Sequence, residues 1–157
     1  MKRHSRRAVL ASTGAAGAAG ALGFPLLTVR PAAATPDKMK AAIKEVVGEA
    51  PVKKGRVTLD IPPLVENGNT VAMTVTVESP MTPADHVKVI HVFNEKNPQP
   101  NVIDAHFGPR AARASFSSRI RLADTQTLVA IAEMSDGSFW SDQVDVIVTL
   151  AACLEYN

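Results

Sequence analysis

The sequence predicts an all-β fold, an antiparallel β-sandwich preceded by one short helix. After Gly55, apolar residues recur at every second position in a series of short runs, which is the pattern of half-buried strands. Turn-forming residues separate these runs at intervals of roughly 8–12 residues, as they do in sandwiches. Only one stretch has helical periodicity, so the sequence lacks the crossover helices that a parallel sheet requires.

The helix is expected first, over residues 35–47. Thr35-Pro36-Asp37 supplies a capping residue, a proline for the first helical position and an early acid, and Gly48 with Pro51 ends the run. Its apolar residues form a short stripe at helical spacing, namely Ile43, Val46 and Val47. A stripe this short indicates a helix that lies on another element and is not part of a bundle.

Eight runs with strand character follow, and their alternation indicates which side chains face inward. In the first run Val57, Leu59 and Ile61 share one face, with polar residues on the other. The fifth run has an apolar inward face and places Arg119 and Arg121 outward. The runs comprise residues 56–61, 71–77, 87–93, 102–107, 114–122, 128–134, 139–140 and 144–150.

The sequence also predicts two turns and the directions in which the last side chains of the chain point. Glu66-Asn67-Gly68 predicts a turn, and Ser135-Asp136-Gly137 is a strong hairpin signal. The inward residues of the last run are expected to be Val144, Val146, Val148 and Leu150. If the alternation continues, Ala152 faces inward and Cys153 faces outward.

The first 34 residues are expected to be a cleaved twin-arginine export signal. Ser5-Arg6-Arg7-Ala8-Val9-Leu10 fits the signal, and Ala32-Ala33-Ala34 fits a cleavage site. The alternative is a membrane anchor, but four glycines and Pro25 make the intervening stretch weakly hydrophobic. Cleavage leaves a helix and connection at 35–55, a sandwich at 56–150 and a tail at 151–157, located in the periplasm.

The charge of the remaining chain argues against nucleic acid as a partner. The whole sequence carries +2, but its first 34 residues hold five basic groups and no acid, so the rest carries −3. Aromatic residues make up only 4%, too few for base-stacking platforms. After signal cleavage we also expect no association with the membrane.

No pattern in the sequence predicts an enzyme, a metal or a cofactor. A nucleophile elbow, an H-E-x-x-H helix, a P-loop and a C-x-x-C pair are all missing. His86 and His91 lie an odd number of residues apart on one predicted strand, which points them to opposite faces unless a bulge intervenes. Asp104 and His106 share a face and make at most a two-ligand fragment, so ordinary surface histidines are the favoured interpretation.

Cys153 is the only cysteine, and it cannot close a disulfide within the chain. One interpretation is a small buried residue that completes the last strand. The other is an exposed thiol, either reactive or paired between chains as a Cys153-linked homodimer. The nearby carboxylate of Glu155 disfavours the thiolate, so an exposed thiol would need a partner protein to activate it.

Three longer segments resemble SoxY, the sulfur-carrier subunit of the periplasmic thiosulfate-oxidising Sox system. They are Glu78-Ser79-Pro80-Met81-Thr82-Pro83-Ala84-Asp85-His86-Val87-Lys88, Ser118-Arg119-Ile120-Arg121-Leu122 and Ala132-Glu133-Met134-Ser135-Asp136-Gly137-Ser138-Phe139-Trp140. The resemblance extends over nearly all of the chain after the signal, including the helix and the cysteine. It implies an immunoglobulin-like sandwich that forms a heterodimer with a second sandwich subunit, SoxZ.

The resemblance also implies a role for Cys153. In this family the C-terminal cysteine is not catalytic but holds sulfur intermediates covalently while periplasmic enzymes and a c-type cytochrome act on them. On this chain, Cys153 would carry the thiosulfonate and persulfide adducts, with no catalytic residue, metal or cofactor.

The tail departs from the family pattern, in which glycines flank the cysteine in a Gly-Gly-Cys-Gly-Gly arm. Here the segment reads Ala151-Ala152-Cys153-Leu154-Glu155-Tyr156-Asn157, which is stiffer and bulkier. Two functions therefore stay open. The chain is a sulfur carrier, for a subset of the usual enzymes or for a different sulfur pathway, or it is an adapter module whose tail no longer carries sulfur.

Overall fold

The structure is a computed structural model that describes residues 35–152. The expected export signal at 1–34 and the candidate site residue Cys153 lie outside the described residues. Within them, the helix α2 spans Pro36–Val47. The strands are β1 Val52–Lys54, β2 Val57–Asp60, β3 Leu64–Val65, β4 Val71–Val77, β5 Val87–Asn94, β6 Asn101–His106, β7 Ala114–Ile120, β8 Gln126–Met134 and β9 Phe139–Val148.

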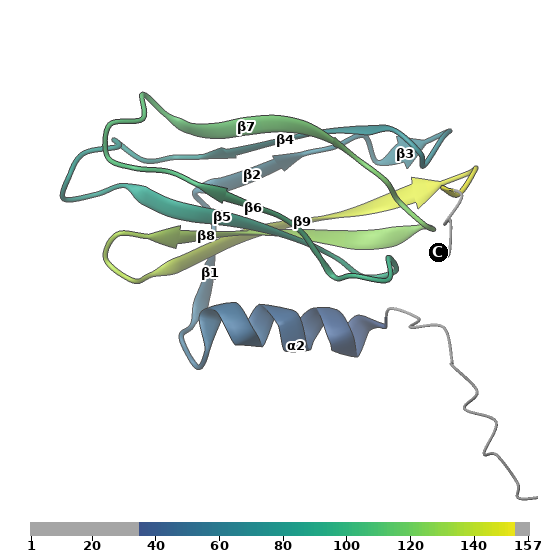
Figure 1. Cartoon of the computed structure of the whole chain (residues 1–157), viewed down its shortest axis with the longest axis horizontal. Coiled ribbons are helices and arrows are strands. Elements are labelled where there is room, and N and C mark those ends of the chain that lie inside the picture. The colour runs from purple at the N-terminus through teal and green to yellow at the C-terminus, as the bar shows by residue number, and fades with distance from the viewer. Residues whose placement is uncertain (1–34, 153–157) are drawn as a thin grey trace, which may run out of the picture. The chain divides into compact units, whose positions relative to one another are not determined.

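The strands form two layers, as an antiparallel sandwich requires (Figure 1). The larger sheet has the order β1-β9-β8-β5-β6, with β3 also paired to β9, and the smaller sheet has the order β2-β4-β7. Most neighbouring strands run antiparallel, while the short strands β1 and β3 pair with β9 in parallel. The predicted all-β sandwich with one short helix is confirmed.

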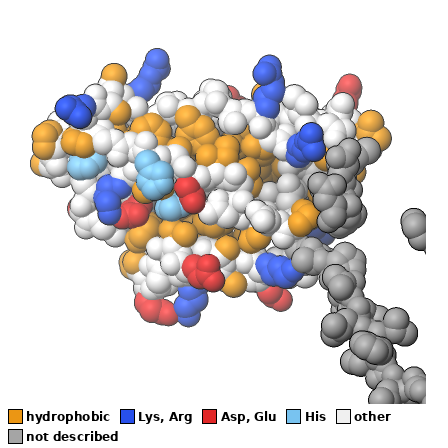
Figure 2. All heavy atoms as spheres, viewed as in Figure 1, with side chains coloured by type: hydrophobic (Ala, Val, Ile, Leu, Met, Phe, Trp, Pro, Cys, Tyr) orange, Lys and Arg blue, Asp and Glu red, His pale blue; other side chains and the backbone are white. Residues whose placement is uncertain are grey.

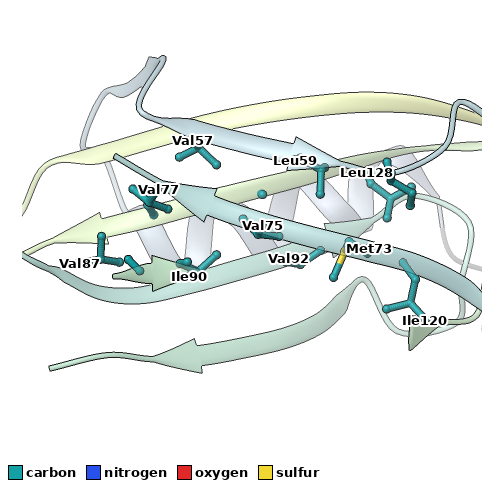
Figure 3. Packing of buried hydrophobic residues seen from close by; sticks show 14 of the residues in the cluster. Val57, Leu59, Met73, Val75, Val77, Val87, Ile90, Val92, Ile120 and Leu128 are labelled. Atoms are coloured by element: carbon teal, nitrogen blue, oxygen red, sulfur yellow. The ribbon is translucent and has the colours of Figure 1, made fainter. Parts of the chain in front are cut away.

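The main core fills the space between the two sheets. Figure 3 shows side chains of the smaller sheet, such as Val57, Leu59 and Val75, directed toward Ile90 and Val92 of the larger sheet. Val75, Ile90 and Val92 are fully buried. Burying a side chain of this size stabilises the fold by about 1.5–3 kcal/mol. The predicted inward face of the first run is therefore correct.

Helix α2 covers the outer face of the larger sheet, which creates a second and smaller core. Met39 packs there with Phe93, Ile131 and Phe139, and the predicted apolar stripe of the helix joins this cluster. Gly48 ends the helix with a φ of 60°, a left-handed conformation that glycine adopts without strain. In residues 35–152, no helix has both the length and the apolar character needed to cross a bilayer.

Strand β9 differs from the expectation in two ways. The runs predicted at 139–140 and 144–150 form one continuous strand, Phe139–Val148. Leu150 was expected to face inward but is 62% exposed, because the strand ends at Val148 and the alternation of faces ends with it. Ala152 is nevertheless buried, as expected.

One long side of the sandwich is closed by contacts between the two sheets. On this side the carboxylate of Asp142 in β9 accepts a hydrogen bond of 2.9 Å from the main-chain N–H of Leu59 in β2. Strand β3 pairs with β9 along the same side. The opposite side lies between β6 and β7, the outermost strands of their sheets, which do not pair with each other.

Candidate functional site

The chain leaves β9 through a short segment that the sandwich holds by its main chain. The N–H of Gly68 donates to the carbonyl oxygen of Leu150 over 2.8 Å. The N–H of Ala152 donates to the carbonyl of Leu122 over 3.0 Å, and the N–H of Leu122 donates to the carbonyl of Gly68 over 2.8 Å. We call Gly68, Leu122 and Ala152 the tail anchor.

Gly68 is at the centre of the tail anchor because the other segments approach it too closely for a side chain. A Cβ atom at this position would lie 2.4 Å from the carbonyl oxygen of Leu122 and 2.9 Å from the nitrogen of Ala152. Both distances are well below van der Waals contact with a main-chain atom. Glycine therefore allows the turn at 66–69, the end of the β7 segment and the tail to meet.

The tail anchor buries the residue that comes directly before the cysteine. Ala152 is 6% exposed, and Leu122 is fully buried in the main core. The described main chain is therefore buried and hydrogen-bonded at residue 152, the last residue that the structure describes. The fold thus fixes the chain up to Ala152.

The histidines do not form a shared site. His86 contacts the carbonyl oxygen of Thr82 through Nδ1 over 3.0 Å. His106 is exposed at the end of β6. His86 lies just before β5 and His91 lies within it, and the pairing of β5 with β8 shifts register between Val87 and Val89. No group of three or more potential metal ligands occurs among residues 35–152.

Asp104 contacts His91. The two-ligand fragment considered from the sequence would have paired it with His106 instead. The Nδ1 of His91 lies 2.7 Å from a carboxylate oxygen of Asp104, and the amide of Asn101 donates to both carboxylate oxygens. His91 is 9% exposed, and its ring stacks on Phe93 with 6.3 Å between the centroids. These contacts link β6 to β5 within the larger sheet.

Among residues 35–152, one carboxyl group has a clearly displaced pKa, and it lies in the β8–β9 hairpin. Hydrogen bonds from the side chain and the main-chain N–H of Ser138 hold the pKa of Asp136 below its usual value. The tail leaves from the opposite end of β9, about 30 Å away for a strand of this length. This carboxyl therefore takes no part in the chemistry of the tail. The other strand-end acids considered from sequence, Asp60, Glu66 and Glu78, are exposed.

A comparison with protein families matches the chain over most of its length. The family described as "Sulfur oxidation protein SoxY" matches residues 43–153, a span that contains the sandwich, the tail anchor and Cys153. The chain belongs to the SoxY family. The resemblance noted in the sequence is thus confirmed, and membership of SoxY assigns the chain to sulfur oxidation in a carrier role.

A solved structure of a SoxY protein supports the same assignment. The sulfur carrier protein SoxY from Chlorobium limicola f thiosulfatophilum is 27% identical, with a TM-score of 0.61. The match covers 73% of this chain and 98% of that one. No curated protein sequence matched the chain.

More distant structures share the fold alone. A superoxide reductase (neelaredoxin) variant from Ignicoccus hospitalis is 17% identical, with a TM-score of 0.54, and the match covers 73% of this chain and 92% of that one. A putative superoxide reductase from Thermotoga maritima is 18% identical, also at 0.54, with 62% and 93% covered. The SoxY sandwich is therefore an architecture that proteins with other names also use.

Sequence reasoning identified Cys153 but missed the residues that fix its point of departure. The turn at Glu66-Asn67-Gly68 was predicted, yet the pattern gave no indication that Gly68 meets Leu122 and Ala152. The available signal was a glycine in a turn directly before a strand, which indicates a close approach of main chains only when its neighbours are known.

Proposed function

We propose that this SoxY protein is a non-catalytic sulfur carrier of the periplasm that holds thiosulfate-derived sulfur on Cys153. The observation that carries the proposal is the family match, because it includes Cys153 and the chain has no other cysteine. The tail anchor supports it, since the fold brings the chain to a defined point one residue before the thiol.

The proposed chemistry takes place in two steps at the sulfur atom of Cys153. The Cys153 thiolate and thiosulfate form one S–S bond and lose two electrons, which a c-type cytochrome accepts, to give the S-thiosulfonate. Attack of water on the terminal sulfonate then breaks its S–S bond and releases sulfate with two protons, which leaves a persulfide on Cys153. The carrier provides the sulfur atom and its position, and partner enzymes perform both steps.

The tail anchor explains why alanine stands where the family pattern has glycine. The methyl group of Ala152 is buried, and its N–H is bonded to Leu122, so this residue belongs to the sandwich. A glycine would weaken both the packing and the order of the segment. We therefore propose that partner enzymes receive the thiol close to the Gly68–Leu122 end of the sandwich, without a long glycine arm.

The proposal includes three further assignments, two that follow from the family and one, export, that follows from the sequence of residues 1–34. A SoxZ-like subunit forms a heterodimer with the chain, and sulfur-oxidising periplasmic enzymes with a c-type cytochrome act on the bound sulfur. Residues 1–34 direct export by the twin-arginine route, which carries folded proteins and suits a pair that leaves the cytoplasm together. The last assignment is tested by detecting the processed chain in a periplasmic extract, and its absence there would reject it.

The carrier role is tested by intact mass spectrometry of the periplasmic protein after cells are supplied with thiosulfate. We expect thiosulfonate and persulfide adducts on the wild-type chain and none on the Cys153→Ser variant. Dithiothreitol should remove both adducts, because each is held by an S–S bond. An unmodified thiol in cells that contain active Sox enzymes would reject the proposal.

A second function, an adapter module without bound sulfur, is favoured by the absence of glycines on both sides of Cys153. Bulky residues follow the thiol directly, Leu154 and Tyr156 among them, and they oppose entry into a narrow active site. For an adapter, Cys153→Ser should leave thiosulfate oxidation by the host unchanged. Electrophoresis without reductant also shows whether a Cys153-linked homodimer accumulates, which would mark a storage or off-pathway form.

A further inference from the structure

The turn at the centre of the tail anchor contains an asparagine directly before a glycine, Asn67-Gly68. In such a pair the main-chain nitrogen of the second residue can attack the side-chain amide carbon of the asparagine and close a five-membered succinimide ring. Glycine hinders this attack least, because it has no Cβ atom and its main chain rotates freely. Every other asparagine between residues 35 and 152 is followed by a residue with a side chain. Asn67 is therefore the asparagine of this region with the greatest chemical tendency to lose its amide group.

The structure activates the side chain of Asn67 for this attack. Its Oδ1 accepts two hydrogen bonds from Asn69, one of 2.9 Å from the main-chain N–H and one of 3.1 Å from the side-chain amide. When a nitrogen adds to the amide carbon, negative charge develops on this same oxygen. N–H groups already placed at hydrogen-bond distance stabilise that charge. The amide carbon of Asn67 is thus a polarised electrophile in the folded chain.

The nucleophile, the main-chain nitrogen of Gly68, is occupied by the tail. Its N–H donates to the carbonyl oxygen of Leu150 over 2.8 Å, and an N–H engaged in this way gives up its proton less readily. Ring closure also requires Gly68 to rotate, but the residue is buried, and a Cβ there would lie 2.4 Å from the carbonyl oxygen of Leu122 and 2.9 Å from the nitrogen of Ala152. A site packed this closely leaves no room for the rotation. The tail anchor therefore prevents the attack.

Water, which completes the reaction, reaches the turn. The turn after β3 lies at the same end of the sandwich as the ends of β7 and β9 (Figure 1). Asn67 is exposed there, as are Glu66 and Thr70. On the face seen in Figure 2, the hydrophobic side chains gather in a band between the two layers of strands, with polar and charged side chains around it. The contacts of Gly68, and not the supply of water, are thus what limits the reaction of Asn67.

We propose that Asn67 is a deamidation site that the tail anchor keeps unreactive and that reacts once the tail is released. In the first step the bond between the Gly68 nitrogen and Cγ of Asn67 forms, the bond between Cγ and Nδ2 breaks, and ammonia leaves with the proton of the Gly68 N–H. Water then breaks one carbon–nitrogen bond of the ring, restores the N–H and leaves aspartate or isoaspartate at position 67. No electrons are transferred. The inference depends on the tail anchor alone and not on the carriage of sulfur.

Isoaspartate at position 67 would make the release permanent. In this product the main chain runs through the former side chain, so one more carbon atom lies between the Cα of residue 67 and the nitrogen of Gly68. Gly68 meets Leu122 and Ala152 too closely to absorb such a displacement. The longer turn therefore cannot restore the hydrogen bonds of Gly68 to Leu150 and Leu122. The modification accumulates on chains whose tail has been released and keeps them in that state.

Peptide mapping by mass spectrometry of the purified full chain, incubated in mildly alkaline buffer, tests the protection. We expect Asn67 to deamidate at least about tenfold more slowly in the folded wild type than in the same chain unfolded in urea, because the reaction waits for local opening. Ala152→Gly should react faster than wild type while its circular dichroism still shows the folded state. Equal rates in the folded and the unfolded wild type, or in Ala152→Gly and wild type, would overturn the inference.

Two control variants separate the tail anchor from general stability. Ala151→Gly adds the same backbone freedom at an exposed neighbour and should react as the wild type does. Asp142→Ala removes the hydrogen bond to Leu59 within the sandwich, away from the tail anchor, and should leave the rate at Asn67 well below that of Ala152→Gly. Acceleration by Asp142→Ala equal to that by Ala152→Gly would show that global unfolding controls the reaction, and it would refute the role of the tail anchor.

Hydrogen–deuterium exchange tests the permanent release. The deamidated chain carries an added negative charge and is separated by anion exchange. In the isoaspartate form, the amides of Leu122 and Ala152 should exchange faster than in the unmodified chain, while that of Val92 in the main core stays unchanged. Asn67→Asp supplies the charge without the longer main chain and should exchange as the wild type does. Unchanged exchange at Leu122 and Ala152 in the isoaspartate form would contradict the proposal.

Discussion

The main-chain N–H of Ala152 is hydrogen-bonded to the carbonyl oxygen of Leu122 over 3.0 Å, which ties the segment before Cys153 to the end of β7. The two residues are far apart in the sequence and belong to segments from different sheets. Both are buried, so the bond is shielded from water. The segment that follows β9 is therefore part of the buried structure at residue 152.

Replacing Gly68 by alanine should destabilise the fold and disturb the tail anchor. The new methyl group would lie 2.4 Å from the carbonyl oxygen of Leu122, a main-chain atom that moves only if its strand moves. Overpacking of this kind costs about 1–3 kcal/mol, to be measured by urea unfolding. Gly108→Ala is the matched control, because a Cβ there meets no atom within 4 Å. Equal stability of the two variants would show that the close approach is unimportant.

Replacing Ala152 by glycine should lower the stability of the fold and make the thiol of Cys153 more accessible to reagents. The change removes one buried methyl group and adds backbone freedom, for a loss of about 1–2 kcal/mol in the free energy of unfolding. The freed segment should let Cys153 react faster with bulky thiol reagents. Ala151→Gly serves as the control, since Ala151 is exposed and should lose less stability. An identical effect of both substitutions would contradict a specific anchor at residue 152.

Replacing Asp142 by alanine should loosen the closed side of the sandwich. The substitution leaves the N–H of Leu59 without its acceptor at 2.9 Å, and Leu59 is nearly fully buried. We expect a loss of about 1–2 kcal/mol in urea unfolding and faster exchange of the Leu59 amide. Gln143→Ala alters an exposed neighbour in the same strand and should have little effect on either measurement. Unchanged exchange at Leu59 would argue against the link.

Asp136 should contribute stability that depends on pH. Hydrogen bonds from Ser138 lower its pKa from the usual 3.8, so the folded state binds a proton less readily than the unfolded state. This contribution is complete above about pH 4 and disappears as the pH falls through the lowered pKa. The urea midpoint should therefore fall more steeply below pH 4 for wild type than for Asp136→Asn. A wild-type slope in Asp136→Asn would contradict this prediction.

The sequence was sufficient to predict the elements that bury an alternating face. Val57, Leu59 and Ile61 repeat at every second position and are buried, and the run predicted at 71–77 is strand β4 with the same bounds. These elements follow from local pattern, because each needs only one apolar face directed toward a core. The helix was predictable for the same reason, with its capping residues adding the bounds.

The remaining features depend on contacts that no local pattern contains. Strand β1 reads Val52–Lys54 and is exposed, so only its parallel pairing with β9 makes it a strand. Leu150 was assigned to the wrong face because the end of β9 is set by the neighbouring segment 65–68. The role of Gly68 is equally non-local, since it meets residues 54 and 84 positions further along the chain.

Strand β9 also determines how the molecule bears mechanical load. A force applied to the chain beyond Ala152 is transmitted through Ala152 and along β9. That strand is paired with β8 over its length and with β1 and β3 on its other edge, so a pull along its axis shears many hydrogen bonds at once. The tail anchor holds this segment through the hydrogen bonds of Leu150 and Ala152, which are fewer than those of β9, so we expect them to break first.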